Sequence, residues 1–303
     1  MKVHPKIVDR IVEAIKGSET ICVAGHVRPD GDCIGSQLGL TLALTNAGKK
    51  VTCWNQDPVP AKLQFLDPKN MIQPPEKGRH FDCVIATDCA SLERLGTVAD
   101  CINERKIFIN IDHHASNTRY GDLNWIAARE PATDTGSFQY PTTRPSTYHV
   151  AGELVKRGAN LARICDEVYQ SYPLGRVRLL RHVYNKFRLT HNNQIAYFWL
   201  KKSDYSRTGT DPSDSEGLID HIRAIEPVVV ACVFEEVEPQ LTRISLRSKN
   251  SRIDVNKIAQ QFNGGGHAAA AGARIAGTPL SVQRKVVAAI KKSLNGLGKH
   301  ADL

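Results

Sequence analysis

The sequence predicts an α/β protein with an N-terminal, doubly wound, mostly parallel sheet and a second, smaller α/β domain. Its 303 residues exceed the roughly 150 residues of an average domain. In the first half, short apolar runs alternate with segments of helical periodicity, which is typical of a parallel sheet covered by helices on both faces. Hydrophobic residues make up 41% of the chain and charged residues 23%, as in an ordinary folded protein. We therefore expect two domains and a sizeable buried core.

The first domain is expected to begin with an amphipathic helix. Isoleucine and valine recur there at helical spacing, at positions 7, 8, 11, 12 and 15, with charged residues between them. Four short apolar runs then predict buried strands at 20–24, 50–54, 81–87 and 106–111. Their alternation with helical segments favours a parallel arrangement.

Helices are predicted between and after these strands. One spans 33–46 and ends before Gly48, a residue suited to the left-handed conformation that follows a helix. Another begins at Ser146, a good N-cap, and a third spans about 160–172, directly before a proline.

The domain boundary is placed where a basic helical stretch, 174–189, runs into a turn-like His-Asn-Asn sequence. The predicted domains are therefore 1–190 and 191–303. In the second, strands are expected at 194–200, 228–234 and 241–246, and helices at 214–224, 254–261 and 280–294.

Charge and cysteine content narrow the class of protein. Lys and Arg number 40 against 31 Asp and Glu, and the net charge of +9 favours a nucleotide or nucleic acid as partner ahead of membrane lipid. The longest apolar run, 227–234, is far shorter than the roughly 18 residues of a membrane span. The eight cysteines form no CxxC pair, so we expect reduced, buried thiols in a cytoplasmic protein without membrane association.

Histidine and aspartate side chains follow three of the predicted strands. These residues are His26, Asp30, Asp32, Asp88, Asp112, His113 and His114. The carboxyl ends of parallel strands meet at one edge of a sheet, which is where ligands bind. Carboxylates mixed with imidazole suit Mn²⁺ or a similar divalent ion, although Pro29-Asp30-Gly31 is also common turn chemistry.

So many carboxylates in one place would repel one another without cations. A pair of ions about 3.5 to 4 Å apart would neutralise them, activate a bridging water and stabilise the leaving oxygen in phosphoryl transfer. The three strand ends together therefore predict a two-metal centre.

The second domain contains a candidate anion site. Gly264, Gly265 and Gly266 would let backbone N–H groups approach a phosphate, and His267 adds a side-chain donor. Arg247 is a suitable cation for the same phosphate. The alternative for the glycines is a tight turn. Arginines at 144, 176, 178, 181 and 188 could line a track for a nucleotide backbone or form a solvated helix face.

Six segments together resemble one known family. Four of them, in chain order, are GHVRPDGDCIGS, ATDCASLERLG, NIDHHASN and TDTGSFQYPTTRP. They resemble the motifs of the DHH phosphoesterases, which are named for the triplet at 112–114. The segments ISLRSK and FNGGGHAAAAG resemble the companion domain of that family, DHHA1.

The resemblance implies roles for individual residues. One Mn²⁺ would be bound by His26, Asp30 and Asp88, and a second by Asp32, Asp88, His113 and Asp134, with Mg²⁺ or Co²⁺ as substitutes. His114 would contact the scissile phosphate, and Asp112 would orient an imidazole or act only as a loop cap. The catalytic residues would thus be His114, Asp88 and Asp112, and the substrate-binding residues Arg247, Gly264, Gly265, Gly266 and His267.

The resemblance also implies a function. We expect a Mn²⁺-dependent phosphoesterase that hydrolyses very short RNA and 3′-phosphoadenosine 5′-phosphate. The alternatives are hydrolysis of cyclic or linear dinucleotides, and nucleotide binding with impaired catalysis. Whether the chain forms a homodimer is left open.

The chain departs from the family's pattern between its third and fourth motifs. Only 20 positions separate His114 from Asp134, and the pattern leads us to expect several tens more. A helix-strand unit is therefore predicted to be absent between about 128 and 133. If Asp134 no longer follows a strand, the second metal loses a fixed ligand.

Overall fold

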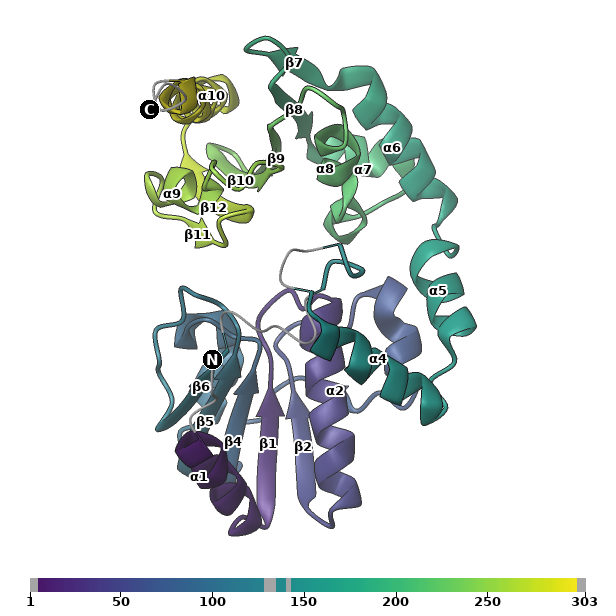
Figure 1. Ribbon diagram of the computed structural model, residues 1–303, viewed down its shortest axis with the longest axis vertical. Helices are drawn as coiled ribbons and strands as arrows, with labels where there is room; N and C mark the ends of the chain where they lie inside the picture. Colours follow the sequence, from purple (N-terminus) through teal and green to yellow (C-terminus); the bar gives the residue numbers. More distant parts are fainter. Residues whose placement is uncertain (1–4, 128–134, 140–142, 299–303) are drawn as a thin grey trace. The chain divides into compact units, whose positions relative to one another are not determined.

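The computed structural model describes residues 5–127, 135–139 and 143–298. The chain divides into two compact units, Met1–Ser171 and Tyr172–Leu303 (Figure 1). Asp134 and residues 128–133, where the sequence predicts a missing unit, lie outside the described residues.

The first unit is built on a parallel sheet of six strands in the order β3-β2-β1-β4-β5-β6. The strands are β1 (Thr20–Ala24), β2 (Lys50–Trp54), β3 (Ile72–Gln73), β4 (Phe81–Thr87), β5 (Arg105–Asp112) and β6 (Leu123–Ile126). The chain first builds the sheet outward from β1 through β2 and β3, then returns to β4 on the other side. The carboxyl ends of β1 and β4 therefore flank the point at which the strand order reverses, a usual ligand position in open α/β sheets.

Helices cover both faces of this sheet, which confirms the predicted doubly wound class. The helical elements are α1 (Pro5–Lys16), α2 (Gly31–Asn46), η1 (Ala61–Leu66), η2 (Leu92–Leu95), α3 (Thr97–Cys101), α4 (Pro145–Lys156) and α5 (Leu161–Tyr169). Side chains alternate between faces along β1: Ile21 and Val23 pack with α1 and α2, whereas Cys22 and Ala24 pack with η2 and α3.

Local signals set the ends of α2. Asp30 is its N-cap, and its side chain accepts a hydrogen bond from the N–H of Cys33 at 3.1 Å. At the other end Gly48 has φ +83°, the left-handed conformation expected there. The observed helix begins at Gly31, two residues before the predicted start.

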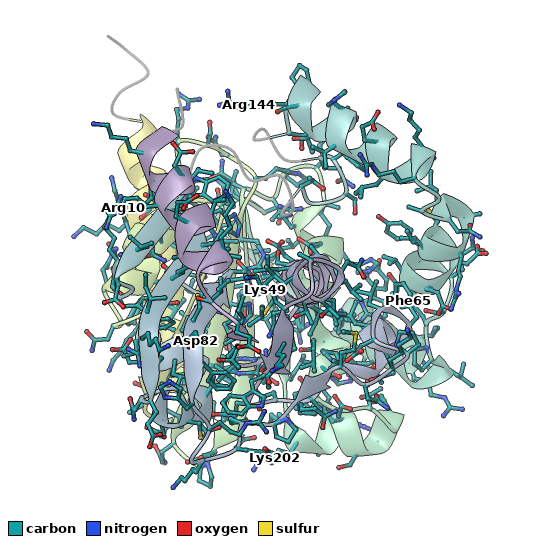
Figure 2. All side chains as sticks on the ribbon, turned by 90° about the horizontal axis from the view of Figure 1, so that it is seen from below. Arg10, Lys49, Phe65, Asp82, Arg144 and Lys202 are labelled. Atoms are coloured by element: carbon teal, nitrogen blue, oxygen red, sulfur yellow. The ribbon has the colours of Figure 1, made fainter. Side chains whose placement is uncertain are left out.

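Asp82 (Figure 2) is the second residue of β4, at the end of that strand opposite Asp88, and it ties three strands together. One of its carboxylate oxygens accepts hydrogen bonds from the N–H groups of Glu19 and Thr20, both at 3.0 Å. The other oxygen lies 2.7 Å from the ammonium group of Lys106 on β5. These contacts fix the start of β1 against β4 and β5.

The second unit contains a mixed sheet of six strands in the order β11-β12-β10-β9-β8-β7. The strands are β7 (Arg188–Thr190), β8 (Ile195–Leu200), β9 (Val230–Glu238), β10 (Leu241–Ser248), β11 (Gly265–Gly266) and β12 (Ala270–Ala276). Only β8 and β9 pair in parallel; the other neighbours are antiparallel. The predicted smaller α/β domain is confirmed.

Two layers of helices cover the second sheet. They are α6 (Leu174–Lys186), α7 (Lys202–Thr208), η3 (Pro212–Ser215), α8 (Leu218–Arg223), α9 (Val255–Gln260) and α10 (Pro279–Gly298). Leu179 and Val183 of α6 are fully buried among residues of β8 and α8. For this reason α6 belongs to the second unit, and the division at 171/172 precedes the predicted boundary at 190/191.

All eight cysteines are free thiols, and every one except the half-buried Cys165 is buried. They pack as small apolar side chains, as the sequence predicts. None of the helices within the described ranges is long and apolar enough to cross a membrane.

Candidate metal centre

The ends of three neighbouring strands bring the predicted histidine and aspartate residues together. His26 lies just beyond β1, Asp88 directly after β4, and Asp112 at the end of β5, followed by His113 and His114. Because β1, β4 and β5 are adjacent and parallel, these side chains converge at one edge of the sheet. His26, Asp88 and Asp112 are buried and His113 and His114 are half-buried, whereas Asp30 is exposed at the rim of the cluster.

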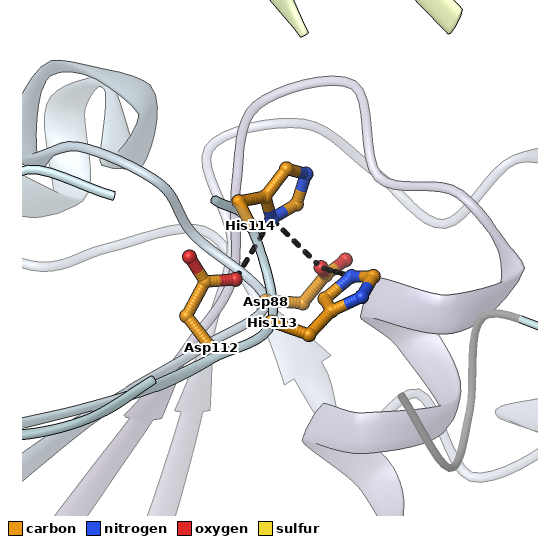
Figure 3. Close-up of side chains that lie close together, drawn as sticks. All are labelled: Asp88, Asp112, His113 and His114. Atoms are coloured by element: carbon orange, nitrogen blue, oxygen red, sulfur yellow. Dashed lines mark hydrogen bonds and ion pairs between the residues drawn. The ribbon is translucent and has the colours of Figure 1, made fainter. Parts of the chain in front are cut away.

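Asp88 is at the centre of the cluster (Figure 3). Its Oδ2 lies 3.4 Å from Nε2 of His26, and its Oδ1 lies 3.0 Å from Nε2 of His113. Nδ1 of His114 is 3.6 Å from the same Oδ1. The two carboxylate oxygens therefore face imidazoles delivered by different strands.

Two further carboxylates reach the cluster from the N-terminal end of α2. Asp32 Oδ2 lies 3.3 Å from Nε2 of His113. Asp30 Oδ1 lies 3.9 Å from Nε2 of His26, while the same oxygen caps α2. The structure thus separates the acids into one set beside His26 and another beside His113, with Asp88 common to both.

Asp112 forms a hydrogen bond with the imidazole of His114, in keeping with the prediction that it orients an imidazole. Its Oδ1 accepts a hydrogen bond from Nδ1 of His114 at 2.8 Å, and its Oδ2 accepts one from the amide of Asn117 at 2.6 Å. A carboxylate can only accept, so the His114 proton lies on Nδ1. The other ring nitrogen of His114 points away from Asp88 and Asp112 (Figure 3).

The electrostatics of the cluster favour charge separation. Burial opposes ionisation of Asp88, but hydrogen bonds from His113 and His26 outweigh it and hold the pKa of Asp88 well below its usual range. Burial alone would lower the pKa of His113, yet Asp88, Asp32 and Asp112 raise it to about 9. The pKa of Asp112 is lowered by His114 and Asn117 against the effect of burial. In this state a proton on His113 compensates the carboxylate charge.

The backbone around the cluster allows little variation. Asp88 has φ +52°, a left-handed conformation that is uncommon for residues other than glycine, and its N–H donates to the carbonyl of Ile111. A Cβ at Gly25 would lie 2.5 Å from the Cys33 sulfur, too close for the present packing. A side chain at position 25 would therefore displace the loop that carries His26.

The donor set fits divalent cations. The cluster contains two groups whose ligand atoms lie within 4.8 Å of one another: Asp88, Asp112, His113 and His114, and His26, Cys33 and Asp88. Adjacent ligands of an octahedral ion with bonds of about 2.1 Å lie about 3 Å apart. The nitrogen-to-oxygen distances of 3.0 to 3.4 Å around Asp88 and His113 agree with that spacing.

The predicted substrate-binding residues meet at one end of the second sheet. Arg247 lies within β10, which continues to Ser248 and does not end at 246 as predicted, and Arg247 is paired with Ala270 of β12. The N–H of His267 donates to the carbonyl of that same Ala270 at 2.7 Å. Arg247 and His267 therefore flank one residue of β12.

The glycines before His267 have a packing role. A Cβ at Gly264 would collide with the carbonyl oxygen of Gly272 and lie 2.5 Å from the Cβ of Ala273. Gly266 has φ +146°, whereas a Cβ at Gly265 would meet only Asn256, at 3.9 Å. Two of the three glycines are thus required by the close approach of this segment to β12.

Several residues around the site were not predicted. Asn117 fixes Asp112, and it belongs to the quoted segment NIDHHASN, so its place five residues after Asp112 was an available signal. Asn55 donates to the carbonyl of His26 at 3.2 Å and to the side chain of Gln37 at 3.1 Å. Cys33 lies among the possible metal donors. Cys33 lies in the same quoted segment as His26, so it too had an available signal, whereas nothing in the sequence pattern marks Asn55 and Gln37 as neighbours of His26.

Comparison with known proteins agrees with this arrangement. Residues 20–172 match the DHH family, N-terminal domain, and residues 192–296 match the DHHA1 domain. A Thermus thermophilus protein named bifunctional oligoribonuclease and PAP phosphatase NrnA is 30% identical, over 97% of this chain and 95% of the relative. A Bacillus subtilis protein of the same name is 26% identical, over 88% of this chain and 92% of the relative.

A solved structure shows the same fold. An exopolyphosphatase-related protein from Bacteroides fragilis superposes with a TM-score of 0.86 at 24% identity, over 96% of this chain and 98% of that one.

The alignment with the Thermus protein contains 324 positions, whereas 97% of 303 residues is about 294, so about 30 positions have no counterpart here. The matches nevertheless span both units and include every strand that carries the metal cluster. The chain therefore belongs to the DHH family and carries the DHHA1 domain.

Proposed function

We propose that this protein is a metal-dependent phosphoesterase that hydrolyses very short RNA and 3′-phosphoadenosine 5′-phosphate. The observation that carries the proposal is the position of Asp88, whose two oxygens face His26 and His113 separately. The relatives named as oligoribonuclease and PAP phosphatase support the substrate class. The net charge of +9 is in keeping with anionic substrates.

The residues would divide into two metal sites that share Asp88. His26 and Asp30 would hold one ion, and Asp32 and His113 the other, in agreement with the two sets of contacts around Asp88. Asp134 remains a proposed ligand of the second ion. We propose Mn²⁺ for both sites, because carboxylate oxygens with few imidazoles suit it. When bound, the ions would supply Lewis acidity and lower the pKa of a water molecule.

The side chains of the cluster would handle protons. His113 must lose its proton to solvent before its Nε2 can ligate a cation, because Asp88 stays ionised as the ligand shared by both sites. His114 keeps Nδ1–H on Asp112, so its outward Nε2 is the nitrogen that would take up a second proton from solvent and give it to the departing ribose oxygen. As that P–O bond breaks, water supplies the oxygen of the new P–O bond. Asp112 stabilises the protonated imidazole.

In the DHHA1 domain, Arg247 and the segment Gly264 to His267 would bind the nucleotide. The guanidinium group suits a phosphate, and His267 adds a donor beside it. Gly265 is the glycine with room above it, so its backbone is the most accessible to a ligand.

The test is hydrolysis of a 5′-labelled RNA dinucleotide and of 3′-phosphoadenosine 5′-phosphate, in Mn²⁺, in Mg²⁺ and in EDTA. We expect metal-dependent release of mononucleotide and phosphate, and about two Mn²⁺ per chain by elemental analysis. Asp88→Asn should lose bound metal and at least about 10³-fold in kcat, a loss comparable to that of removing one essential electrostatic group.

Asp100→Asn is the matched control, because Asp100 is an exposed aspartate of the same unit. Unchanged turnover in Asp88→Asn would contradict the assignment of the metal centre. Binding of both nucleotides without turnover in any metal would instead establish the alternative, a nucleotide-binding protein.

A further inference from the structure

Helix α6 carries an excess of positive charge. Its sequence, LGRVRLLRHVYNK, contains three arginines and a lysine but no acidic residue. The arginines have different surroundings. Arg176 is buried, and its guanidinium group donates to the carbonyls of Asp214 and Glu216 at 2.5 and 2.6 Å. It therefore holds the chain around η3, whereas Arg178 and Arg181 are exposed.

Arg178 and Arg181 line a pocket of about 180 Å³ between α6 and the end of α7. The lining residues are Arg178, Arg181, His182, Asn185, Arg207 and Thr208. The other three from α6 lie three, four and seven residues after Arg178, so the four share one face of the helix. The pocket is thus built by side chains of two helices of the second unit.

The positive charge in this pocket is only partly compensated. Asp204 is the acidic group there: its Oδ1 lies 2.5 Å from Arg207 and 3.5 Å from Nε2 of His182. Its Oδ2 accepts from the N–H of Lys201 at 3.0 Å. Among the described residues, neither Arg178 nor Arg181 forms an ion pair. Three arginines against one aspartate leave a formal charge of +2 with His182 neutral.

We propose that this pocket binds a phosphate group, at a site whose residues are distinct from the metal ligands and from Arg247 and the glycine segment. Guanidinium groups match phosphate oxygens with paired N–H donors, and Asn185 offers a neutral amide beside them. The hydroxyl of Thr208 is already engaged with the carbonyl of Asp204 and with Thr210, so it does not contribute.

The volume of this pocket limits the size of the ligand that it can hold. Pockets for drug-sized molecules measure about 300 to 1,000 Å³. A pocket of about 180 Å³ is too small for a whole nucleotide but accommodates one phosphate group. That phosphate would come either from the backbone of a single-stranded RNA that extends beyond the pocket or from free inorganic phosphate.

The test measures binding by the full-length protein in EDTA, so that it does not depend on the metal centre or on turnover. One arm titrates a fluorescein-labelled single-stranded RNA of about ten nucleotides, and the other titrates inorganic phosphate by calorimetry. We expect R178A/R181A to bind at least one of these probes about tenfold more weakly. If RNA is the source, the log–log slope of its affinity against salt concentration should fall by about 0.7 for each phosphate that the variant no longer neutralises.

R252A/R284A is the matched control, since it removes the same charge from exposed arginines of the same unit that lie outside the pocket. R178K/R181K keeps the charge but not the paired donors and should retain part of the affinity. Thermal unfolding of each variant separates a binding defect from a folding defect. Equal affinity of the wild type and R178A/R181A for both probes would overturn the proposal, as would an equal loss in the control.

Discussion

Asp88 shows how one side chain joins two halves of a site. Strand β4 lies between β1 and β5, so the residue after β4 is within reach of side chains from both neighbours. The left-handed backbone of Asp88 directs the carboxylate between His26 and His113. A carboxylate has two oxygens and can therefore bind two cations. Among the described residues of the cluster, Asp88 is the side chain that contacts both His26 and His113.

Asn117 should support catalysis without holding metal. Its amide donates to Asp112, which in turn accepts the Nδ1–H of His114. Replacing Asn117 by Ala should lower kcat by about 10- to 100-fold, a usual effect of losing such a supporting hydrogen bond. Elemental analysis should still find the wild-type amount of bound metal. Asn103→Ala, at an exposed asparagine of the same unit, should leave kcat unchanged; metal loss in Asn117→Ala would contradict the positioning role.

Asp82 should make stability depend on pH. Hydrogen bonds from Lys106, Thr20 and Glu19 hold the pKa of Asp82 well below its unfolded value. A lowered folded pKa stabilises the native state above the unfolded pKa of about 3.9, and this contribution disappears as the pH falls below it. Asp82→Asn should therefore lower the free energy of unfolding at pH 7, with a smaller difference from wild type at about pH 2.5, below the unfolded pKa.

Urea unfolding of both proteins in EDTA at pH 7, 4 and about 2.5 measures this difference, which should change little from pH 7 to 4 and shrink below pH 4. The metal cluster titrates in both proteins and cancels in the comparison. If the difference in the free energy of unfolding is the same at all of these pH values, the charge of the Asp82 carboxylate does not contribute to stability.

The segment between α9 and β12 illustrates what an element requires of its residues. It runs so close to β12 that a side chain is excluded at the first and third positions of the glycine run, but not at the second. Gly264 and Gly266 are glycine because a Cβ there would collide with β12, whereas Gly265 has room for a side chain.

Gly264→Ala should lower the free energy of unfolding by about 1 to 3 kcal/mol, as overpacking does. Its Cβ would collide with the backbone of Gly272, which cannot move without disturbing the pairing of β12 with β10. Gly265→Ala serves as the control and should change stability by less than about 0.5 kcal/mol. Urea unfolding checks both. Equal effects in the two variants would show that packing against β12 does not explain the glycines.

The two units have separate cores. One pair of clusters lies on the faces of the first sheet and another pair on the faces of the second. All described candidate metal ligands lie in the first unit, so metal binding should stabilise that unit directly.

Hydrogen exchange with and without Mn²⁺ tests this expectation. A metal at about 100 times its Kd stabilises the state that binds it by about 2.7 kcal/mol. Added protection should therefore appear in peptides from β1, β4 and β5, with little change in β8, β9 and β10. Asp88→Asn should abolish the effect. Equal protection of both sheets would show that the units unfold as one.

Much of this molecule follows from local patterns. The runs at 20–24, 50–54 and 81–87 are strands with the predicted bounds, since buried parallel strands are continuously apolar. The sequence did not predict β3, β6, β7, β11 or β12. Strand β6 is only four residues long and includes Asn124, and β12 is an alanine-rich run without marked alternation. Both become strands by pairing with β5 and β10, which local propensity cannot anticipate.

The composition of the candidate metal centre was likewise evident from the residues that follow the strands, because parallel strands must deliver their ends to one edge. The tertiary structure decided which oxygen of Asp88 contacts which imidazole, and that Asn117 donates to Asp112. It also decided that α6 packs in the second unit, where its side chains line a basic pocket. Strand order and side-chain packing are long-range properties. The approach of His26 to Asp88, residues far apart in the sequence, exists only once the sheet has assembled.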